Sequence, residues 1–175
     1  MELQTLPPVY WLYLPDPAPL NRRLLERFGA VKDDPGHRRS HHFHGRYENL
    51  YIERDKIPDI QPLLDTVEQA AQRLLGHREA LRFGFWFNAM GPGHRTTAHS
   101  HEEDDELLSA VYYVSVPENS GDLLLYADPA TIRISPEAGL LVMFPPSLEH
   151  AVEENRGDAL RLSIAFNFGP ATAPD

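Results

Sequence analysis

Short runs of alternating apolar and polar residues occupy the second half of the chain, from Leu81 onward, separated by Gly, Pro, Asn and Asp. Alternation with a period of two predicts strands with one buried face, and the separating residues predict turns. Eight such short strands are typical of a sandwich, barrel or jelly roll. We expect strands near residues 82–90, 97–101, 109–116, 121–126, 131–134, 139–144, 149–153 and 160–168.

Two of these runs differ from the rest, because one face is strongly apolar and the other has polar or large side chains. In "RFGFWFNAM", three phenylalanines alternate with Trp86 and Asn88, and in "LRLSIAFNF", five apolar residues alternate with Arg161, Ser163 and Asn167. Successive side chains of a strand point to opposite faces. We expect the apolar face to pack on helices and the polar face to line a cavity, where a buried guanidinium needs an anionic partner.

The first eighty residues predict a strand and two supporting helices. An apolar stretch at residues 9–14 predicts the strand. A helix is expected to follow the "PDPAP" segment, with Leu20, Leu24, Leu25 and Phe28 at helical spacing and a stop at Gly29. A second helix is expected to begin at Pro58 and Pro62 and to end at Gly76. We assign packing, not chemistry, to both helices.

Composition narrows the classes of function. The net charge of −10, with scattered Lys and Arg, argues against nucleic-acid binding. No apolar run is long enough to span a bilayer and the N-terminus does not resemble a signal peptide, so we expect a cytoplasmic protein. The chain has no cysteine, so any metal must be held by nitrogen and oxygen. The length favours one domain, 1–175, with an N-terminal part (1–80), a β core (81–169) and a disordered tail (170–175).

The candidate chemistry begins with a histidine pair, His99-x-His101. In a chain with nine histidines such a pair arises easily by chance, and His42 and His44 form a second one. The first pair stands out because it falls on a predicted strand, where alternate residues face the same side. His150 follows a later apolar strand, which a jelly roll brings back beside the early ones. With Arg161 on a nearby inner face, a metal and a cation are expected to hold a small anionic ligand between them.

Four segments then carry a resemblance to a known family: "WFNAMGPGHRTTAHSH", "LSAVYYVSVPENSGDLLLYADP", "ISPEAGLLVMFPPSLEHAVEEN" and "RLSIAFNF". Over residues 81–169 the chain resembles the bacterial family of 2-oxoglutarate and Fe(II)-dependent oxygenases of the double-stranded β-helix class. Several linked motifs at fitting separations are more specific than the histidine pair alone. The resemblance implies an α+β, mainly β fold: a double-stranded β-helix, or jelly roll, with about two helices on one face.

The resemblance also implies roles for single residues. His99 and His150 become iron ligands, and Arg161 becomes the partner of the far carboxylate of 2-oxoglutarate, with Ser163 beside it. Tyr113 matches a position that hydrogen-bonds the same carboxylate in related prolyl hydroxylases. Asn88 is expected near the other end of the cofactor. Fe(II) with open positions binds a 2-oxo acid and O₂.

The third metal ligand stays open at this stage. The commonest oxygenase triad is His-x-Asp or His-x-Glu with a distal His, whereas His101 occupies the carboxylate position here. Three interpretations compete: His99, His101 and His150 form the site; His101 and Glu103 supply a His-x-Glu with His150; or only His99 and His150 bind, completed by water or a loop acid. The acids of residues 102–106 either offset the metal charge or form a solvated turn.

Plainer interpretations stand beside several of these roles. Tyr112, Tyr113 and Asn88 fit ordinary core positions. The segment from His37 to His44 is expected to be an exposed loop, which either has no role or borders the mouth of the barrel and touches a substrate.

We therefore expect a 2-oxoglutarate and Fe(II)-dependent dioxygenase that hydroxylates a small molecule or peptide, with O₂ consumed and succinate and CO₂ released. The alternatives are a cupin-like ligand sensor without turnover and a three-histidine dioxygenase that does not use 2-oxoglutarate. A homodimer through an exposed apolar segment near residues 9–14 is a further hypothesis.

Overall fold

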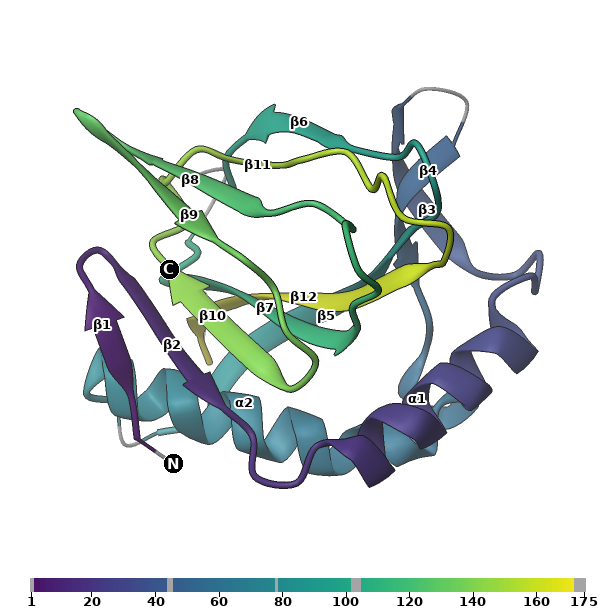
Figure 1. Cartoon of the computed structure of the whole chain (residues 1–175). Coiled ribbons are helices and arrows are strands. Elements are labelled where there is room, and N and C mark those ends of the chain that lie inside the picture. The colour runs from purple at the N-terminus through teal and green to yellow at the C-terminus, as the bar shows by residue number, and fades with distance from the viewer. Residues whose placement is uncertain (1, 44–45, 78, 102–104, 172–175) are drawn as a thin grey trace.

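Two antiparallel sheets face each other in the computed structural model, which describes residues 2–43, 46–77, 79–101 and 105–171 (Figure 1). The large sheet has the order β1 (Gln4–Leu6), β2 (Val9–Tyr13), β10 (Leu140–Phe144), β7 (Leu108–Ser115), β12 (Arg161–Pro170), β5 (Leu81–Met90), β4 (Arg46–Tyr51), β3 (Arg38–Phe43). The small sheet has the order β6 (Thr96–His99), β11 (His150–Val152), β8 (Leu123–Ala127), β9 (Ala130–Ile134).

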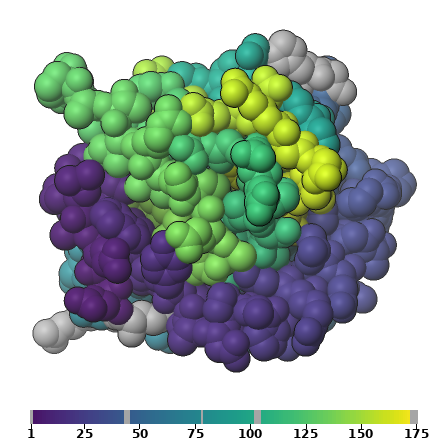
Figure 2. All heavy atoms as spheres, viewed as in Figure 1, coloured from purple at the N-terminus to yellow at the C-terminus, as the bar shows by residue number. Residues whose placement is uncertain are grey.

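This arrangement confirms the expected double-stranded β-helix, and the eight expected strands correspond to β5 through β12. The hairpin of β8 and β9 projects from the body at the upper left of Figures 1 and 2. No helix in the described part of the chain is both long enough and apolar enough to cross a membrane.

Two helices cover the outer face of the large sheet, α1 (Ala18–Val31) and α2 (Gln61–Leu75). Two short 3-10 turns, η1 (Arg54–Lys56) and η2 (Pro58–Ile60), lead into α2. The helices and the sheet share one apolar core, in which the rings of Phe28 and Phe87 lie 5.3 Å apart. The helices thus brace the sheet from the side opposite the candidate site.

Of the two predicted helix ends, the one at Gly76 is confirmed and the one at Gly29 is wrong. Gly76 follows the last turn of α2 with a φ of +67°, the left-handed conformation that favours glycine at a helix end. The stop predicted at Gly29 was wrong, because α1 continues to Val31, whose side chain still packs on the core. A glycine inside a helix weakens it without ending it when packing continues beyond.

The strands β5 and β12 show the two-sided pattern that the sequence predicted. Leu162, Ile164, Phe166 and Phe168 of β12 are buried in the core shared with the helices. Arg161 and the other odd-numbered residues at the start of β12 face the space between the sheets. The sheet therefore separates a packing face from a cavity face.

One expectation about the N-terminal part was wrong, and the structure modifies a second. Residues 38–43, expected in an exposed loop, form β3, which pairs with β4 along the edge of the large sheet. The segment near residues 9–14 is largely covered: Val9, Leu12 and Leu14 are buried, because β2 lies between β1 and β10, while Tyr13 is exposed. A homodimer through this segment stays a prediction.

Candidate metal centre

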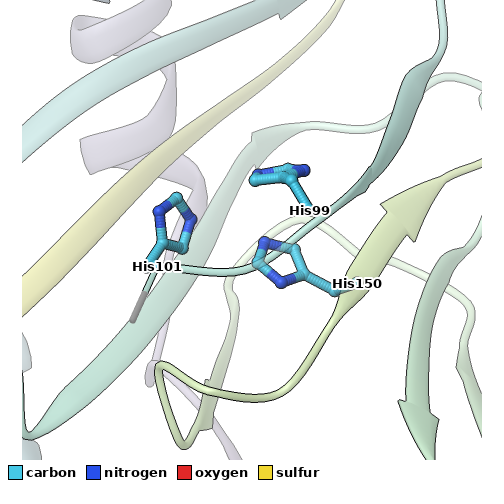
Figure 3. Close-up of side chains that lie close together, drawn as sticks. All are labelled: His99, His101 and His150. Carbon is cyan, nitrogen blue, oxygen red and sulfur yellow. The ribbon is translucent and has the colours of Figure 1, made fainter. Parts of the chain in front are cut away.

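Three histidines converge between the two sheets. One nitrogen each of His99, His101 and His150 lies within 4.8 Å of the others. The ring centroids of His99 and His150 are 4.3 Å apart. The ring centroid of His101 lies 5.0 Å from that of His99 and 5.1 Å from that of His150. Figure 3 shows the three side chains turned toward a common point. Three imidazoles around one point are a donor set suited to a divalent transition metal.

Strand pairing brings these residues together across fifty positions of sequence. His99, the last residue of β6, is the direct partner of His150, the first residue of β11. His101 comes from the segment after β6, and its backbone N–H donates to the carbonyl of Pro146 at 2.9 Å. Two of the three histidines therefore come from neighbouring strands, and the third comes from the segment after β6, which a backbone hydrogen bond holds in place.

Backbone carbonyls orient two of the rings. Nδ1 of His99 lies 2.9 Å from the carbonyl of Thr97, and Nδ1 of His150 lies 3.0 Å from that of Leu148. A ring nitrogen facing a carbonyl carries the proton, so Nε2 of both rings is left with its lone pair. Metal-binding histidines have this same arrangement.

Burial keeps the imidazoles of His101 and His150 neutral. Burial, with added repulsion from His99, lowers the pKa of His150 to about 4. Burial and the neighbouring charges of His150 and His99 lower the pKa of His101 to about 3. Neutral imidazole is the form that binds metal, so the cluster fits a resident cation.

The opposite wall of the cavity belongs to the large sheet. Ser163 of β12 is the direct partner of Tyr113 in β7 and of Asn88 in β5, so these three side chains form one row across adjacent strands. Arg161 lies two residues before Ser163 on the same face. All four predicted cofactor-facing residues therefore line the same pocket as the histidines.

Arg161 is buried, with 2% of its surface exposed. Its Nη1 donates to the carbonyls of Ser120 at 3.1 Å and of Gly121 at 2.7 Å, while its Nε has no partner among the described residues. The hydroxyl of Tyr113 is also buried without a partner there. Burial lowers the pKa of Arg161 and raises that of Tyr113. Two unmatched donors in one buried site fit a carboxylate oxygen.

The contacts of Tyr112 and Asn88 show how these two predicted positions are used within the protein. Tyr112 points to the helices, where its hydroxyl donates to Oδ1 of Asn21 at 2.6 Å, so it fits the plain core interpretation. The Nδ2 of Asn88 donates to the carbonyl of Glu48 at 3.0 Å and to Oδ1 of Asn49 at 2.9 Å. The amide nitrogen of Asn88 is thus satisfied within the protein, and a cofactor contact by Asn88 stays a prediction.

The hairpin of β3 and β4 adds three residues to the pocket: His41, from the cluster that the sequence placed either in an exposed loop or at the mouth of the barrel, and Glu48 and Asn49, which the sequence did not indicate. The signal in the sequence was the histidine cluster itself. His37 of that cluster is buried, with Nε2 2.9 Å from the carbonyl of Val31, a structural role. Residues 102–104, with the alternative ligand Glu103, and His44 lie outside the described residues.

Comparison with known proteins agrees with this geometry. Residues 126–167 match a family model described as "Putative 2OG-Fe(II) oxygenase". A prolyl-4-hydroxylase from Pseudomonas putida shares the fold at 21% identity, with a TM-score of 0.73 and 92% of each chain covered. No curated protein gives a significant match.

Two further structures share the fold. A prolyl hydroxylase from Trichoplax adhaerens, in complex with a hypoxia inducible factor peptide fragment, is 15% identical at a TM-score of 0.70, covering 91% of this chain and 83% of that one. The epimerase SnoN, in complex with Fe³⁺, alpha ketoglutarate and nogalamycin RO, is 16% identical at 0.69, covering 93% and 80%. The chain is therefore similar to 2OG-Fe(II) oxygenases over residues 126–167, and it shares the fold of solved structures that include the complex with Fe³⁺ and alpha ketoglutarate.

Proposed function

We propose that this protein is a hydroxylase that holds Fe(II) with His99, His101 and His150 and binds 2-oxoglutarate with Arg161. The observation that supports this proposal is the arrangement of the cavity: three imidazoles lie on one side, and the Nε of Arg161 and the hydroxyl of Tyr113, without partners among the described residues, lie on the other. Iron bound there supplies oxidation of an unactivated C–H bond, coupled to decarboxylation of 2-oxoglutarate to succinate and CO₂.

The residues of the large sheet hold the far carboxylate of 2-oxoglutarate. The guanidinium of Arg161 is fixed by two backbone carbonyls, so it meets the carboxylate without reorganisation. Tyr113 would donate a hydrogen bond from its hydroxyl to the same carboxylate, and Ser163 lies beside Tyr113 in the row. Burial of all three side chains strengthens these charge-assisted hydrogen bonds by excluding water.

The residues of the small sheet hold the metal. His99 and His150 keep their orientation through the carbonyls of Thr97 and Leu148. His101 packs edge-on against Trp86, with ring centroids 5.6 Å apart. Three neutral ligands leave the metal with more positive charge than a carboxylate-containing triad does, which strengthens its hold on an anionic 2-oxo acid.

The substrate proposed for this site is a small molecule or a peptide, together with O₂. Related structures span both kinds, a prolyl hydroxylase with a peptide and an epimerase with nogalamycin RO. Neither alternative from the sequence, a ligand sensor or a dioxygenase that does not use 2-oxoglutarate, is favoured by the family match. The cytoplasmic location stays a prediction.

Anaerobic titration of the Fe(II) protein with 2-oxoglutarate tests the proposal. We expect a weak visible charge-transfer band in the wild type and its loss in Arg161→Ala. Arg133→Ala is the matched control, because Arg133 lies on β9 with 53% of its side chain exposed and pairs with Asp122 and Glu153. Absence of the band in the wild type would overturn the cofactor assignment.

A second measurement separates an enzyme from a sensor. Under air, we expect iron-dependent formation of succinate from 2-oxoglutarate, which slow uncoupled turnover produces even without the true substrate. A charge-transfer band without succinate would indicate a binding protein. A screen of prolyl peptides and small metabolites for a mass gain of one oxygen then searches for the substrate.

A further inference from the structure

His41 occupies an unusual place at the mouth of the cavity. It belongs to β3, lines the same pocket as the metal cluster and has its ring centroid 6.5 Å from that of His99. Its backbone φ is +55°, in the left-handed region that residues other than glycine seldom adopt. Such strain persists where the surrounding structure enforces it, and it concentrates at functional sites.

A chain of side-chain amides determines which nitrogen of His41 carries the proton. Nδ2 of Asn88 donates to Oδ1 of Asn49, so the oxygen of Asn49 faces Asn88 and its Nδ2 faces His41. That Nδ2 lies 2.9 Å from Nδ1 of His41 and donates to it. Nδ1 is therefore an acceptor, and the neutral ring carries its hydrogen on Nε2.

The Nε2–H group is available to a ligand. Within the described residues, every hydrogen bond of the His41 ring goes to Nδ1, from Asn49 and Ser40. The ring is exposed and does not belong to the three-histidine cluster. Unlike His99 and His150, whose protonated nitrogen faces a carbonyl, His41 presents its protonated nitrogen away from its protein partners.

The neighbours of His41 define the chemistry of that ligand. Glu48 lines the same pocket and is 9% exposed, with its carboxylate 3.4 Å from Nη2 of Arg46. Because the two opposite charges offset each other, this wall offers an anionic group no free cation from the Arg46–Glu48 pair. Trp86, which is 7% exposed, supplies an apolar surface. A neutral acceptor oxygen on an apolar body fits this combination.

We propose that His41 binds the substrate, donating its Nε2–H to a neutral oxygen, an amide carbonyl or a hydroxyl, while the apolar part of the substrate rests on Trp86. This inference rests on the proposed function, because only an enzyme has a substrate. It adds to that function the chemical class of the substrate and a residue that determines specificity. Asn49 is the positioning residue, because it holds the tautomer of His41.

Nitrogen NMR of the ¹⁵N-histidine-labelled protein, loaded with Zn(II) and 2-oxoglutarate, tests this proposal. His41→Gln assigns the resonances, and His42→Gln, at the next residue of β3, is the matched control. We expect His41 to be the Nε2–H tautomer. Titration with N-methylacetamide, a minimal neutral amide, is expected to shift and saturate the Nε2 resonance, with affinity weakened about fivefold in Asn49→Ala.

Each possible result supports or overturns a different part of the proposal. The Nδ1–H tautomer, or an Nε2 resonance that does not respond to N-methylacetamide, would overturn the proposal. A stronger response to sodium acetate than to N-methylacetamide would overturn the neutral class of ligand. If Zn(II) and 2-oxoglutarate fail to bind, the proposed function fails, while the tautomer and the amide response are still measured in the metal-free protein.

Discussion

His99 and His150 are direct partners across the antiparallel pair of β6 and β11, with ring centroids 4.3 Å apart. In each case Nδ1 meets the carbonyl of the residue two positions earlier, Thr97 or Leu148. The two strands thus present two equivalent nitrogen donors to one point. Because this relationship is built into the strand register, the candidate metal centre does not depend on loop conformation for two of its three proposed ligands.

Removal of a histidine ligand should weaken metal binding. We expect His99→Ala and His150→Ala each to lower the affinity for Zn(II) by more than about 100-fold, beyond the range for loss of a ligand's hydrogen-bond partner. His101→Ala tests the three-histidine interpretation: a similar loss supports it, and unchanged affinity contradicts it. Isothermal titration calorimetry measures the affinity, with the exposed His77→Ala as control.

The adjacent tyrosines should respond in opposite ways to loss of the hydroxyl. Tyr112→Phe removes the 2.6 Å hydrogen bond to Asn21, so we expect the free energy of unfolding to fall by about 1–3 kcal/mol with unchanged 2-oxoglutarate affinity. Tyr113→Phe removes a hydroxyl with no partner in the described residues. We expect unchanged stability and about tenfold weaker 2-oxoglutarate binding.

Urea denaturation and the charge-transfer titration measure the two quantities for each variant. Equal losses of 2-oxoglutarate affinity in both variants would contradict the assignment of Tyr113 to the cofactor. A stability loss confined to Tyr113→Phe would contradict the core role of Tyr112.

Gly121 links backbone conformation to the cofactor anchor. Its φ is +87°, an added Cβ would meet the carbonyl of Glu153, and its own carbonyl accepts from Arg161 at 2.7 Å. We expect Gly121→Ala to lower the free energy of unfolding by about 2–3 kcal/mol and to weaken 2-oxoglutarate binding. Gly76→Ala is the control, with φ +67° and no atom within 4 Å of its added Cβ.

For Gly76→Ala we expect a stability loss of about 1–2 kcal/mol from the left-handed backbone alone, with 2-oxoglutarate affinity unchanged. Differential scanning calorimetry and the same titration measure the two effects. If both glycine variants bind 2-oxoglutarate equally well, the loop carbonyls do not position Arg161.

The stability of the metal-free protein should depend on pH through the buried histidines. The pKa of His150 is lowered to about 4 and that of His101 to about 3, whereas both groups titrate near 6.5 in an unfolded chain. Between these values the unfolded chain binds more protons than the folded one, so the free energy of unfolding falls as the pH falls. Above about pH 6.5 both states hold neutral rings, and this dependence disappears.

We therefore expect the urea midpoint of the metal-free protein to fall from pH 6.5 toward pH 4. The slope should be smaller in His150→Gln and in His101→Gln, because each removes one buried imidazole. His77→Gln should retain the wild-type slope, since His77 is exposed. Identical slopes in all four proteins would contradict the buried, neutral state of these histidines.

Local patterns along the chain were sufficient for the β core. Alternation in residues 160–168 places Arg161 and Ser163 opposite Leu162 and Ile164, and the structure has this division. Side-chain period is a local property of an extended backbone, so it can be predicted without knowing the neighbouring strands. The resemblance to a family then located the candidate residues and the cofactors, and the match of residues 126–167 to a 2OG-Fe(II) oxygenase model supports the expected cofactors.

Neighbour relationships between distant strands came only from the tertiary structure. The strands β3 and β4, with His41 and Asn49, were not predicted, because β4 owes its conformation to pairing with β5, and the edge strand β3 to pairing with β4, more than to their own patterns. The extension of α1 beyond Gly29 likewise follows from the packing of Val31. A residue's own sequence neighbourhood specifies the direction of its side chain, whereas contacts such as that of Asn49 with His41 depend on which strands pair in space.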